Sequence, residues 1–395
     1  MASNPLIAGV GMIPFAKPGR SDSYDRMGCE AARRALADAG IPYSAVQQAY
    51  VGYVLGSSTS GQQALYPLGL TGIPIINVNN TCATGSTALY LARQAVESGQ
   101  VEVALALGFE EMRPGALGGG PDGRKPVMEM HARVLHEAVG EQPDVMITGQ
   151  YFGGAGREYA DRYGTRPETF AKIAVKARRH ALRNPHAVFR EPVSIEQVLA
   201  SPSIFGPLTR LQCCPPTCGA AAAIVVSPEF ARRHSISGVE IAAQVMTTDD
   251  AAAFANNSMI RVIGYDMARN AASEAYRRAG IGPEEIDVVE LHDCFTTNEL
   301  LSYEALGLTP EGTAERFVED NDNTYGGRYV VNPSGGLLSK GHPLGATGLA
   351  QCAELVWQLR GQAEDRQVEG ARIGLQHNLG LGGACVVTLY RRVAA

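Results

Sequence analysis

The chain has 395 residues, with 34 basic and 40 acidic side chains and a formal net charge of −6. This length is enough for two or three domains with a large core, and 45% hydrophobic with 19% charged residues is typical of a globular protein. The small acidic excess argues against nucleic acid or a membrane surface as partner, and no window approaches the roughly 20 apolar residues of a membrane span. No signal peptide is recognisable, so we expect a cytoplasmic protein.

The eight cysteines are scattered, mostly inside apolar or glycine-rich runs. This distribution is typical of free thiols in a reducing cytosol rather than of a disulfide framework. Cys213, Cys214 and Cys218 cluster, but no second pair of Cys or His has zinc spacing. We interpret the cluster as core packing and expect no metal site.

Strands and helices alternate through the first hundred residues. The apolar run at 6–12 predicts a strand, and Met27, Ala31 and Leu36 recur at helical spacing up to Gly40, which suits a helix C-terminal cap. Such alternation predicts a mostly parallel sheet covered on both faces. The other elements predicted in this part are a strand at 49–55, a strand–turn–helix unit at 73–97 and a strand at 101–108.

The unit at 73–97 places a cysteine between a strand and a helix. Its apolar run ends at Val78, and from Ala83 onward the apolar side chains follow helical spacing. Cys82 therefore lies at a helix N-terminus, where unpaired N–H groups would lower the pKa of the thiol and make it a nucleophile. The alternative is a small buried residue that fills the corner, and the local sequence does not decide between them.

Two segments of the first half match two segments of the last third in the same order. DAGIPYSAVQQAYV at 38–51 lines up with RAGIGPEEIDVVEL at 278–291, and ATGSTALYLARQ at 83–94 lines up with ATGLAQCAELVW at 346–357. The spacing is far too long for a solenoid repeat. We therefore predict two similar α/β halves packed together.

Residues 109–200 interrupt this pattern with a stretch rich in Gly and Pro, followed by predicted helices at 155–164 and 167–183. We interpret this region as a mainly helical insertion. The predicted organisation is an N-terminal half at 1–115 completed by 201–237, a loop domain at 116–200 and a C-terminal half at 238–395.

One helix of the insertion carries a basic stripe. Lys172, Lys176, Arg179 and Arg183 fall at i, i+4, i+7 and i+11, so they share a helix face. The simpler interpretation is a solvated face. The functional one is a contact with a phosphate-bearing ligand.

Three further stretches combine reactive side chains with tight turns: ELHDCF at 290–295, NPSGGLLSKGHPLGATG at 332–348 and QHNLGLGG at 376–383. The last is read as a glycine-rich turn between two strands. A lone His in a loop is more often structural than catalytic. As a set, however, His292, Cys294 and His342 together with Cys82 fit acyl transfer through a thioester, with His as base and Cys as acid/base.

These stretches resemble the thiolase superfamily. The similarity is carried by NVNNTCATGSTAL, ELHDCFTTNELLSYEALGL, NPSGGLLSKGHPLGATGLAQCAEL and QHNLGLGGA, and it is greatest to the thiolases that in animals are fused to a sterol carrier domain. No such domain follows residue 395, so a stand-alone bacterial enzyme is expected. The resemblance implies an α/β thiolase fold, with two βαβ-type halves in five layers and a loop domain that helps to bind coenzyme A.

The resemblance also implies roles for single residues. Cys82 matches the nucleophile that becomes acylated, and His342 matches the residue that activates it. Cys294 matches an acid/base cysteine, and His292 takes the position of an Asn that holds an oxyanion-site water in other thiolases. Most thiolases carry a C-terminal Cys-x-Gly motif.

Here the best match to that motif is Asn378 and Gly380. The backbone N–H groups of Gly380 and Cys82 would then bind the thioester oxygen, so these three residues are the oxyanion candidates. The four residues of the basic stripe are the candidates for coenzyme A binding.

The expected reaction is thiolysis of a 3-oxoacyl-CoA ester, or its reverse, a Claisen condensation. Coenzyme A is then a substrate, no cofactor is permanently bound, and a homodimer or homotetramer is expected. One alternative is a lyase of the same fold that cleaves a steroid side-chain ester by a retro-aldol reaction. The other is a carrier that binds acyl-CoA or lipid without catalysis.

Overall fold

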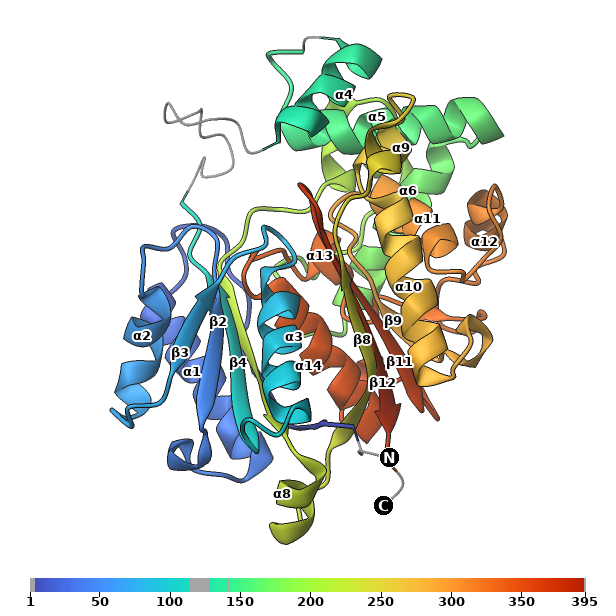
Figure 1. Ribbon diagram of the computed structural model, residues 1–395. Helices are drawn as coiled ribbons and strands as arrows, with labels where there is room; N and C mark the ends of the chain where they lie inside the picture. Colours follow the sequence, from blue (N-terminus) through green and yellow to red (C-terminus); the bar gives the residue numbers. More distant parts are fainter. Residues whose placement is uncertain (1–3, 114–127, 141, 394–395) are drawn as a thin grey trace.

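The computed structural model describes residues 4–113, 128–140 and 142–393 (Figure 1). Its strands form one ten-stranded sheet in the order β10-β9-β11-β12-β8-β1-β7-β4-β2-β3, apart from a short β5–β6 hairpin. The strands of the two halves meet where β1 and β8 pair antiparallel, Leu6 with Glu240 and Ile7 with Val239. The predicted boundary between 115 and 116 lies outside the described residues.

The main elements of the first half are, in chain order, β1 (Leu6–Met12), α1 (Tyr24–Ala39), β2 (Gln48–Gly52), α2 (Ser60–Leu65), β3 (Ile75–Val78), α3 (Thr84–Glu97), β4 (Val103–Glu110), β7 (Gly219–Val226) and α8 (Pro228–Arg233). Those of the second half are β8 (Val239–Thr247), α9 (Met259–Val262), α10 (Tyr265–Ala279), β9 (Val288–Glu290), α11 (Thr296–Ala305), α12 (Ala314–Glu319), β10 (Val330–Val331), α13 (Gly336–Ser339), α14 (Thr347–Arg360), β11 (Ile373–Gly380) and β12 (Ala384–Arg392). Between β4 and β7 lie α4 (Glu129–Val139), α5 (Ile147–Tyr163), α6 (Pro167–Ala181), α7 (Ile195–Leu199), β5 (Ser203–Phe205) and β6 (Leu208–Thr209).

The elements stack in five layers (Figure 1). Helices α3 and α14 lie between the two halves of the sheet, α1 and α2 cover the outer face of one half, and α10 and α11 cover the outer face of the other. The three large hydrophobic cores follow this order. In the central one, Leu89 of α3 and Leu355 of α14 pack with side chains of strands from both halves.

Both internal matches seen in the sequence fall on equivalent elements. Helices α1 and α10 each end at a glycine in the left-handed conformation, Gly40 with φ 66° and Gly280 with φ 63°, and each is followed by a 3₁₀ turn and a parallel strand. Helices α3 and α14 are the second matched pair. The described residues therefore contain two similar α/β halves, as predicted.

Strand β11 differs from the prediction. A glycine-rich turn was expected from Gln376, but the strand continues to Gly380 and pairs residue by residue with β12. The polar side chains in this run are buried and do not mark a turn: those of Gln376 and Asn378 are hydrogen-bonded, and only the stretch after Gly380 turns the chain. Among the described residues, no helix is long and apolar enough to cross a membrane.

The N-terminal ends of α3 and α14 approach each other through glycines. A Cβ atom on Gly85 would lie 2.6 Å from the carbonyl oxygen of Gly345, and one on Gly108 would lie 2.1 Å from the same oxygen. A Cβ on Gly348 would lie 2.1 Å from the Ser86 hydroxyl. The turn before α14 can therefore lie against the first half only because these positions have no side chain.

This contact predicts a difference between two buried strand glycines. We expect Gly108→Ala to lower the free energy of unfolding by about 1–3 kcal/mol, the usual cost of overpacking, because its methyl group meets backbone. Gly374→Ala should cost less than about 1 kcal/mol, because the nearest neighbours of its methyl group are leucine side-chain atoms at 3.2–3.7 Å rather than backbone. Urea denaturation of both variants checks this, and equal midpoints would contradict it.

Candidate active site

The turn before α3, which carries Cys82, has a strained backbone at the preceding residue. Thr81 has φ 47°, a region that a β-branched residue rarely adopts. The turn is held by the Thr84 hydroxyl, which donates to the Thr81 carbonyl at 2.6 Å and accepts the Asn80 N–H at 2.8 Å. Cys82 is half-buried and follows directly.

Three reactive side chains from separate parts of the chain meet at this turn. One donor atom each of Cys82, His292 and His342 lies within 4.8 Å of the other two. The rings of His292 and His342 are 5.0 Å apart between centroids and nearly perpendicular, at 84°. His292 follows β9, and His342 precedes α14. The structure thus brings together the nucleophile and both histidines named from the sequence.

Hydrogen bonds assign the tautomer of His342. The Thr347 hydroxyl donates to the Pro343 carbonyl at 3.0 Å, so it accepts from His342 Nδ1, which lies 2.7 Å away. His342 Nε2 then carries the lone pair, and this buried atom has no hydrogen-bond partner among the residues that the structure describes. A backbone bond from His342 N–H to the Thr217 hydroxyl, at 2.6 Å, fixes the residue from the other side. His342 is therefore arranged as a base.

The opposite tautomer follows for His292. The side-chain amide of Asn378 donates to the Cys82 carbonyl at 3.1 Å and to His292 Nδ1 at 3.0 Å. Because Nδ1 accepts, the proton of a neutral His292 is on Nε2, which makes it a hydrogen-bond donor. The same arrangement argues against a metal ion at the three side chains, because His292 has no second free lone pair to offer.

A buried chain of hydrogen bonds fixes the orientation of that amide. The Tyr390 hydroxyl donates to Gln376 Oε1 at 2.5 Å, and Gln376 Nε2 donates to the Ser86 hydroxyl at 2.9 Å. Ser86 in turn donates to Asn378 Oδ1 at 2.8 Å. Both amide hydrogens of Asn378 are thus engaged, so its side chain positions His292. The side-chain amide of Asn378 is therefore not free to donate to an oxyanion, contrary to the expectation from the sequence.

Gly380 lies against the nucleophile turn. A Cβ atom there would be 2.5 Å from the Asn80 carbonyl oxygen and 3.1 Å from the nitrogen of Ala83. Only a glycine allows this approach. Its assignment as an oxyanion donor stays a prediction.

The pKa of Cys82 is the reverse of the prediction from the sequence. Burial raises the pKa of the thiol to about 12, and the Glu110 carboxylate adds to the shift. The backbone N–H at the helix start acts in the expected direction but is outweighed. Burial also lowers the pKa of His342 to about 3 and that of His292 well below its usual value. At neutral pH the site therefore holds a neutral thiol and two neutral imidazoles.

Cys294 is buried next to a cysteine that the sequence analysis assigned to packing. Cys213 and Phe295 form an antiparallel bridge, and the Cys214 N–H donates to the Cys294 carbonyl at 2.9 Å. Burial raises the pKa of the Cys294 thiol well above its usual range, and the thiols of Cys214 and Cys82 contribute. Cys214 thus belongs to the site. The adjacent cysteines 213 and 214 before a buried strand were visible in the sequence. Their neighbour in the structure, Cys294, is 80 positions after Cys214, so the sequence did not show the contact.

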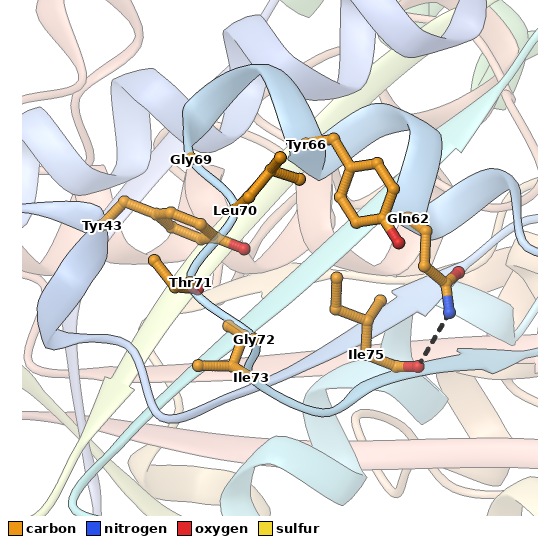
Figure 2. Close-up of a pocket in the computed structure, with 9 residues that line it drawn as sticks. All are labelled: Tyr43, Gln62, Tyr66, Gly69, Leu70, Thr71, Gly72, Ile73 and Ile75. Carbon is orange, nitrogen blue, oxygen red and sulfur yellow. Dashed lines mark hydrogen bonds between the residues drawn. The ribbon is translucent and has the colours of Figure 1, made fainter.

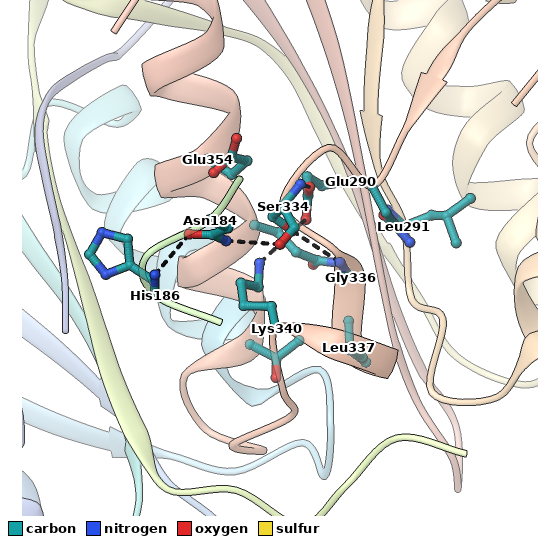
Figure 3. Close-up of polar contacts among 12 residues, drawn as sticks. Asn184, His186, Glu290, Leu291, Ser334, Gly336, Leu337, Lys340 and Glu354 are labelled. Carbon is teal, nitrogen blue, oxygen red and sulfur yellow. Dashed lines mark hydrogen bonds and ion pairs between the residues drawn. The ribbon is translucent and has the colours of Figure 1, made fainter. Parts of the chain in front are cut away.

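The loop before His342 is tied to the end of β9 by a buried carboxylate (Figure 3). Glu290 accepts the N–H of Ser334 at 3.1 Å and its hydroxyl at 2.8 Å, and Lys340 Nζ lies 3.4 Å from the same carboxylate. Asp293 accepts the N–H groups of Leu337 and Leu338 at 2.7 and 3.3 Å. These contacts fix the stretch that carries His292 and Cys294 relative to the one that carries His342.

The basic stripe does not form an open face. Lys176 is buried, forms an ion pair with Glu299 of α11 and donates to the Val331 carbonyl at 3.2 Å. Lys172 pairs with Glu319 of α12. Arg183 lies beyond the end of α6, with its guanidinium 5.2 Å from the Tyr325 ring centroid, and Arg179 is exposed.

This correction leaves Arg179 and Arg183 as candidates for coenzyme A contacts, because the charge of Lys176 is neutralised in the interior.

A separate surface hollow lies beside β3 (Figure 2). Its lining includes Tyr43, Tyr66 and Leu70. No candidate catalytic residue lines it, so the reactive side chains are not part of this hollow.

Comparison with known proteins agrees with this geometry. Residues 6–228 match the family model for the thiolase N-terminal domain, and residues 251–390 match the one for the thiolase C-terminal domain-like family. Sterol carrier protein 2 of Rattus norvegicus is 55% identical over 391 residues, which cover 98% of this chain and 71% of that protein.

Two further proteins bear on the chemistry. A benzoylsuccinyl-CoA thiolase subunit of Thauera aromatica is 38% identical over 96% of this chain and 94% of its own. The structure of the Ltp2–ChsH2(DUF35) aldolase superposes with a TM-score of 0.84 at 25% identity and covers 98% of both chains. On these matches and on the fold, the chain belongs to the thiolase family.

Proposed function

We propose that the protein is a 3-oxoacyl-CoA thiolase that works through an acyl-Cys82 intermediate. One observation carries the proposal: the Cys82 thiol and one ring nitrogen each of His292 and His342, from three parts of the chain, lie within 4.8 Å of one another. The hydrogen bonds described above favour a free lone pair on His342 and an N–H donor on His292. This set supplies a nucleophile, its base and a donor for developing negative charge. The relative named as a benzoylsuccinyl-CoA thiolase subunit supports a CoA ester as substrate.

In the first half-reaction His342 Nε2 takes the proton of Cys82, and the thiolate attacks the 3-keto carbon. The bond between C2 and C3 breaks, and its electron pair leaves as the enolate of the shorter acyl-CoA. His292 Nε2–H donates to this oxyanion, and Cys294 protonates C2. The products are acyl-Cys82, a Cys294 thiolate and a protonated His342.

In the second half-reaction the Cys294 thiolate takes the proton of coenzyme A. The CoA thiolate attacks the acyl-Cys82 thioester, and the N–H groups of Cys82 and Gly380 bind the oxyanion. Cys82 leaves as a thiolate and recovers its proton from His342. Protons and electrons therefore balance over the cycle, and charges appear only in pairs inside a buried site.

The lyase is the second candidate, because the aldolase structure has a TM-score of 0.84 over 98% of the chain. A retro-aldol reaction does not require an acylated cysteine, so activity of a Cys82→Ala variant on a 3-hydroxyacyl-CoA ester would favour it. The full set of Cys82, His292, Cys294 and His342 favours the thiolase. The homodimer or homotetramer and the cytoplasmic location stay predictions.

Replacement of the nucleophile tests the proposal directly. We expect Cys82→Ser to lower turnover of a 3-oxoacyl-CoA with coenzyme A by roughly 10³-fold or more, as for other covalent nucleophiles. Loss of the enolate absorbance of acetoacetyl-CoA, or of a longer ester, is the measurement. Cys29→Ser on α1 is the control and should retain activity. A Cys82→Ser enzyme with wild-type turnover would exclude the mechanism.

A second pair of variants separates the two neighbouring thiols. Cys294→Ala should lower kcat by about 10²–10⁴-fold, the usual contribution of general acid–base catalysis. Cys214→Ala should lower it far less, because Cys294 carries the proton in both half-reactions. The acid/base role would pass to Cys214 if the Cys214 variant showed the larger loss.

The raised pKa of Cys82 predicts a pH profile. Below a pKa of about 12 the thiolate fraction grows tenfold per pH unit. Alkylation of Cys82 by iodoacetamide should therefore rise without a plateau between pH 6 and 9, as measured by intact mass with Cys82→Ser as the background. A plateau over this range would show a preformed thiolate–imidazolium pair and contradict the neutral resting site.

A further inference from the structure

A buried carboxylate from the first half binds the turn that carries His342. Glu110 ends β4 and is 1% exposed. Its Oε2 accepts the N–H of Gly345 at 3.0 Å and that of Val54 at 3.1 Å, and its Oε1 accepts the N–H of Leu55 at 2.9 Å. The three donors come from both halves of the molecule.

All three partners are donors. A carboxylate can accept all three bonds, whereas a carboxyl proton would find no acceptor among these partners. Burial raises the pKa of Glu110, and the bonds from the three N–H groups oppose this shift. We therefore treat the group as an anion held by backbone dipoles, with no cationic side chain among these three partners.

The position of Gly345 makes this contact relevant to the chemistry. It lies three residues after His342 and two before Thr347, the residue that sets the tautomer of His342. Gly345 lies so close to β2 and β4 that no side chain would fit, because a Cβ atom there would be 2.3 Å from the Phe109 carbonyl oxygen and 2.6 Å from that of Gly52. The bond to Glu110 holds the turn in this close contact.

We propose that Glu110 is a positioning residue of the reaction, which holds the His342 turn at its distance from Cys82. This inference rests on the proposed roles of these two residues. Its charge acts on Cys82, where it is the cause of the raised pKa second to burial. The other titratable groups around Cys82 are His292, Cys294, His342 and Cys214.

Glu110→Gln separates this role from mere packing. The amide has nearly the same shape, but it has no charge and places an NH₂ group against a backbone N–H. We expect kcat to fall by about 10²-fold with little change in KM, the usual effect of a misplaced catalytic group. Alkylation of Cys82 by iodoacetamide at pH 8 should at the same time become roughly threefold faster or more, because the thiol pKa falls.

Two matched variants complete the experiment. Glu111→Gln removes the adjacent exposed carboxylate, which binds the Tyr24 N–H, and should leave both rates within about twofold of wild type. Glu110→Asp keeps the charge but is one methylene shorter. This variant should lower kcat and leave the alkylation rate unchanged. A packing defect alone would not give faster alkylation in Glu110→Gln and an unchanged alkylation rate in Glu110→Asp.

The proposal is overturned if Glu110→Gln matches Glu111→Gln in both rates. It is also overturned if Glu110→Asp retains wild-type kcat, a result that decides the matter even where Glu110→Gln does not fold. Alkylation needs no substrate. A wild-type protein that cleaves no 3-oxoacyl-CoA would therefore contradict the proposed function, while the alkylation ratio would still test Glu110.

Discussion

The contact between the turn before α14 and the ends of β2 and β4 is the constraint on which the site depends. At glycines 85, 108, 345 and 348 a Cβ atom would clash across this contact between the two halves. The starts of α3 and α14 can then face each other, and with them Cys82 and His342. In the proposed mechanism the internal duplication has a chemical use, because one of the two equivalent helix starts would supply the nucleophile and the other the base.

Buried hydrogen bonds, rather than a preformed ion pair, prepare this site for reaction. The chain from Tyr390 through Gln376, Ser86 and Asn378 fixes His292 as a donor, and Thr347 fixes His342 as an acceptor. Neutral groups in a site of low polarity avoid the large cost of isolated buried charges. The charges that the proposed mechanism creates would therefore interact strongly with the oriented dipoles around them.

Much of the fold followed from the sequence, because strand and helix periodicity, the duplicated segments and the motifs around Cys82 and His342 are local signals. Other features depend on distant partners. The pKa of Cys82 was expected to fall, since local sequence shows a helix start but neither the burial nor the Glu110 carboxylate. Lys176 looked available until Glu299 was seen to neutralise it. The turn expected at 376–383 begins only after Gly380 for the same reason, since Gln376 and Asn378 have buried partners on other elements. Glu110 itself was visible as an acid at the end of an apolar strand, but its three donors were not.

The most direct test of the account is mass mapping of the wild-type protein mixed with a 3-oxoacyl-CoA in the absence of free coenzyme A. The first half-reaction then proceeds and the second cannot. The account predicts an acyl group on the peptide that contains Cys82, which disappears when coenzyme A is added and a new acyl-CoA forms. Cleavage of the substrate with Cys82 unmodified at all times would contradict it and point to the lyase.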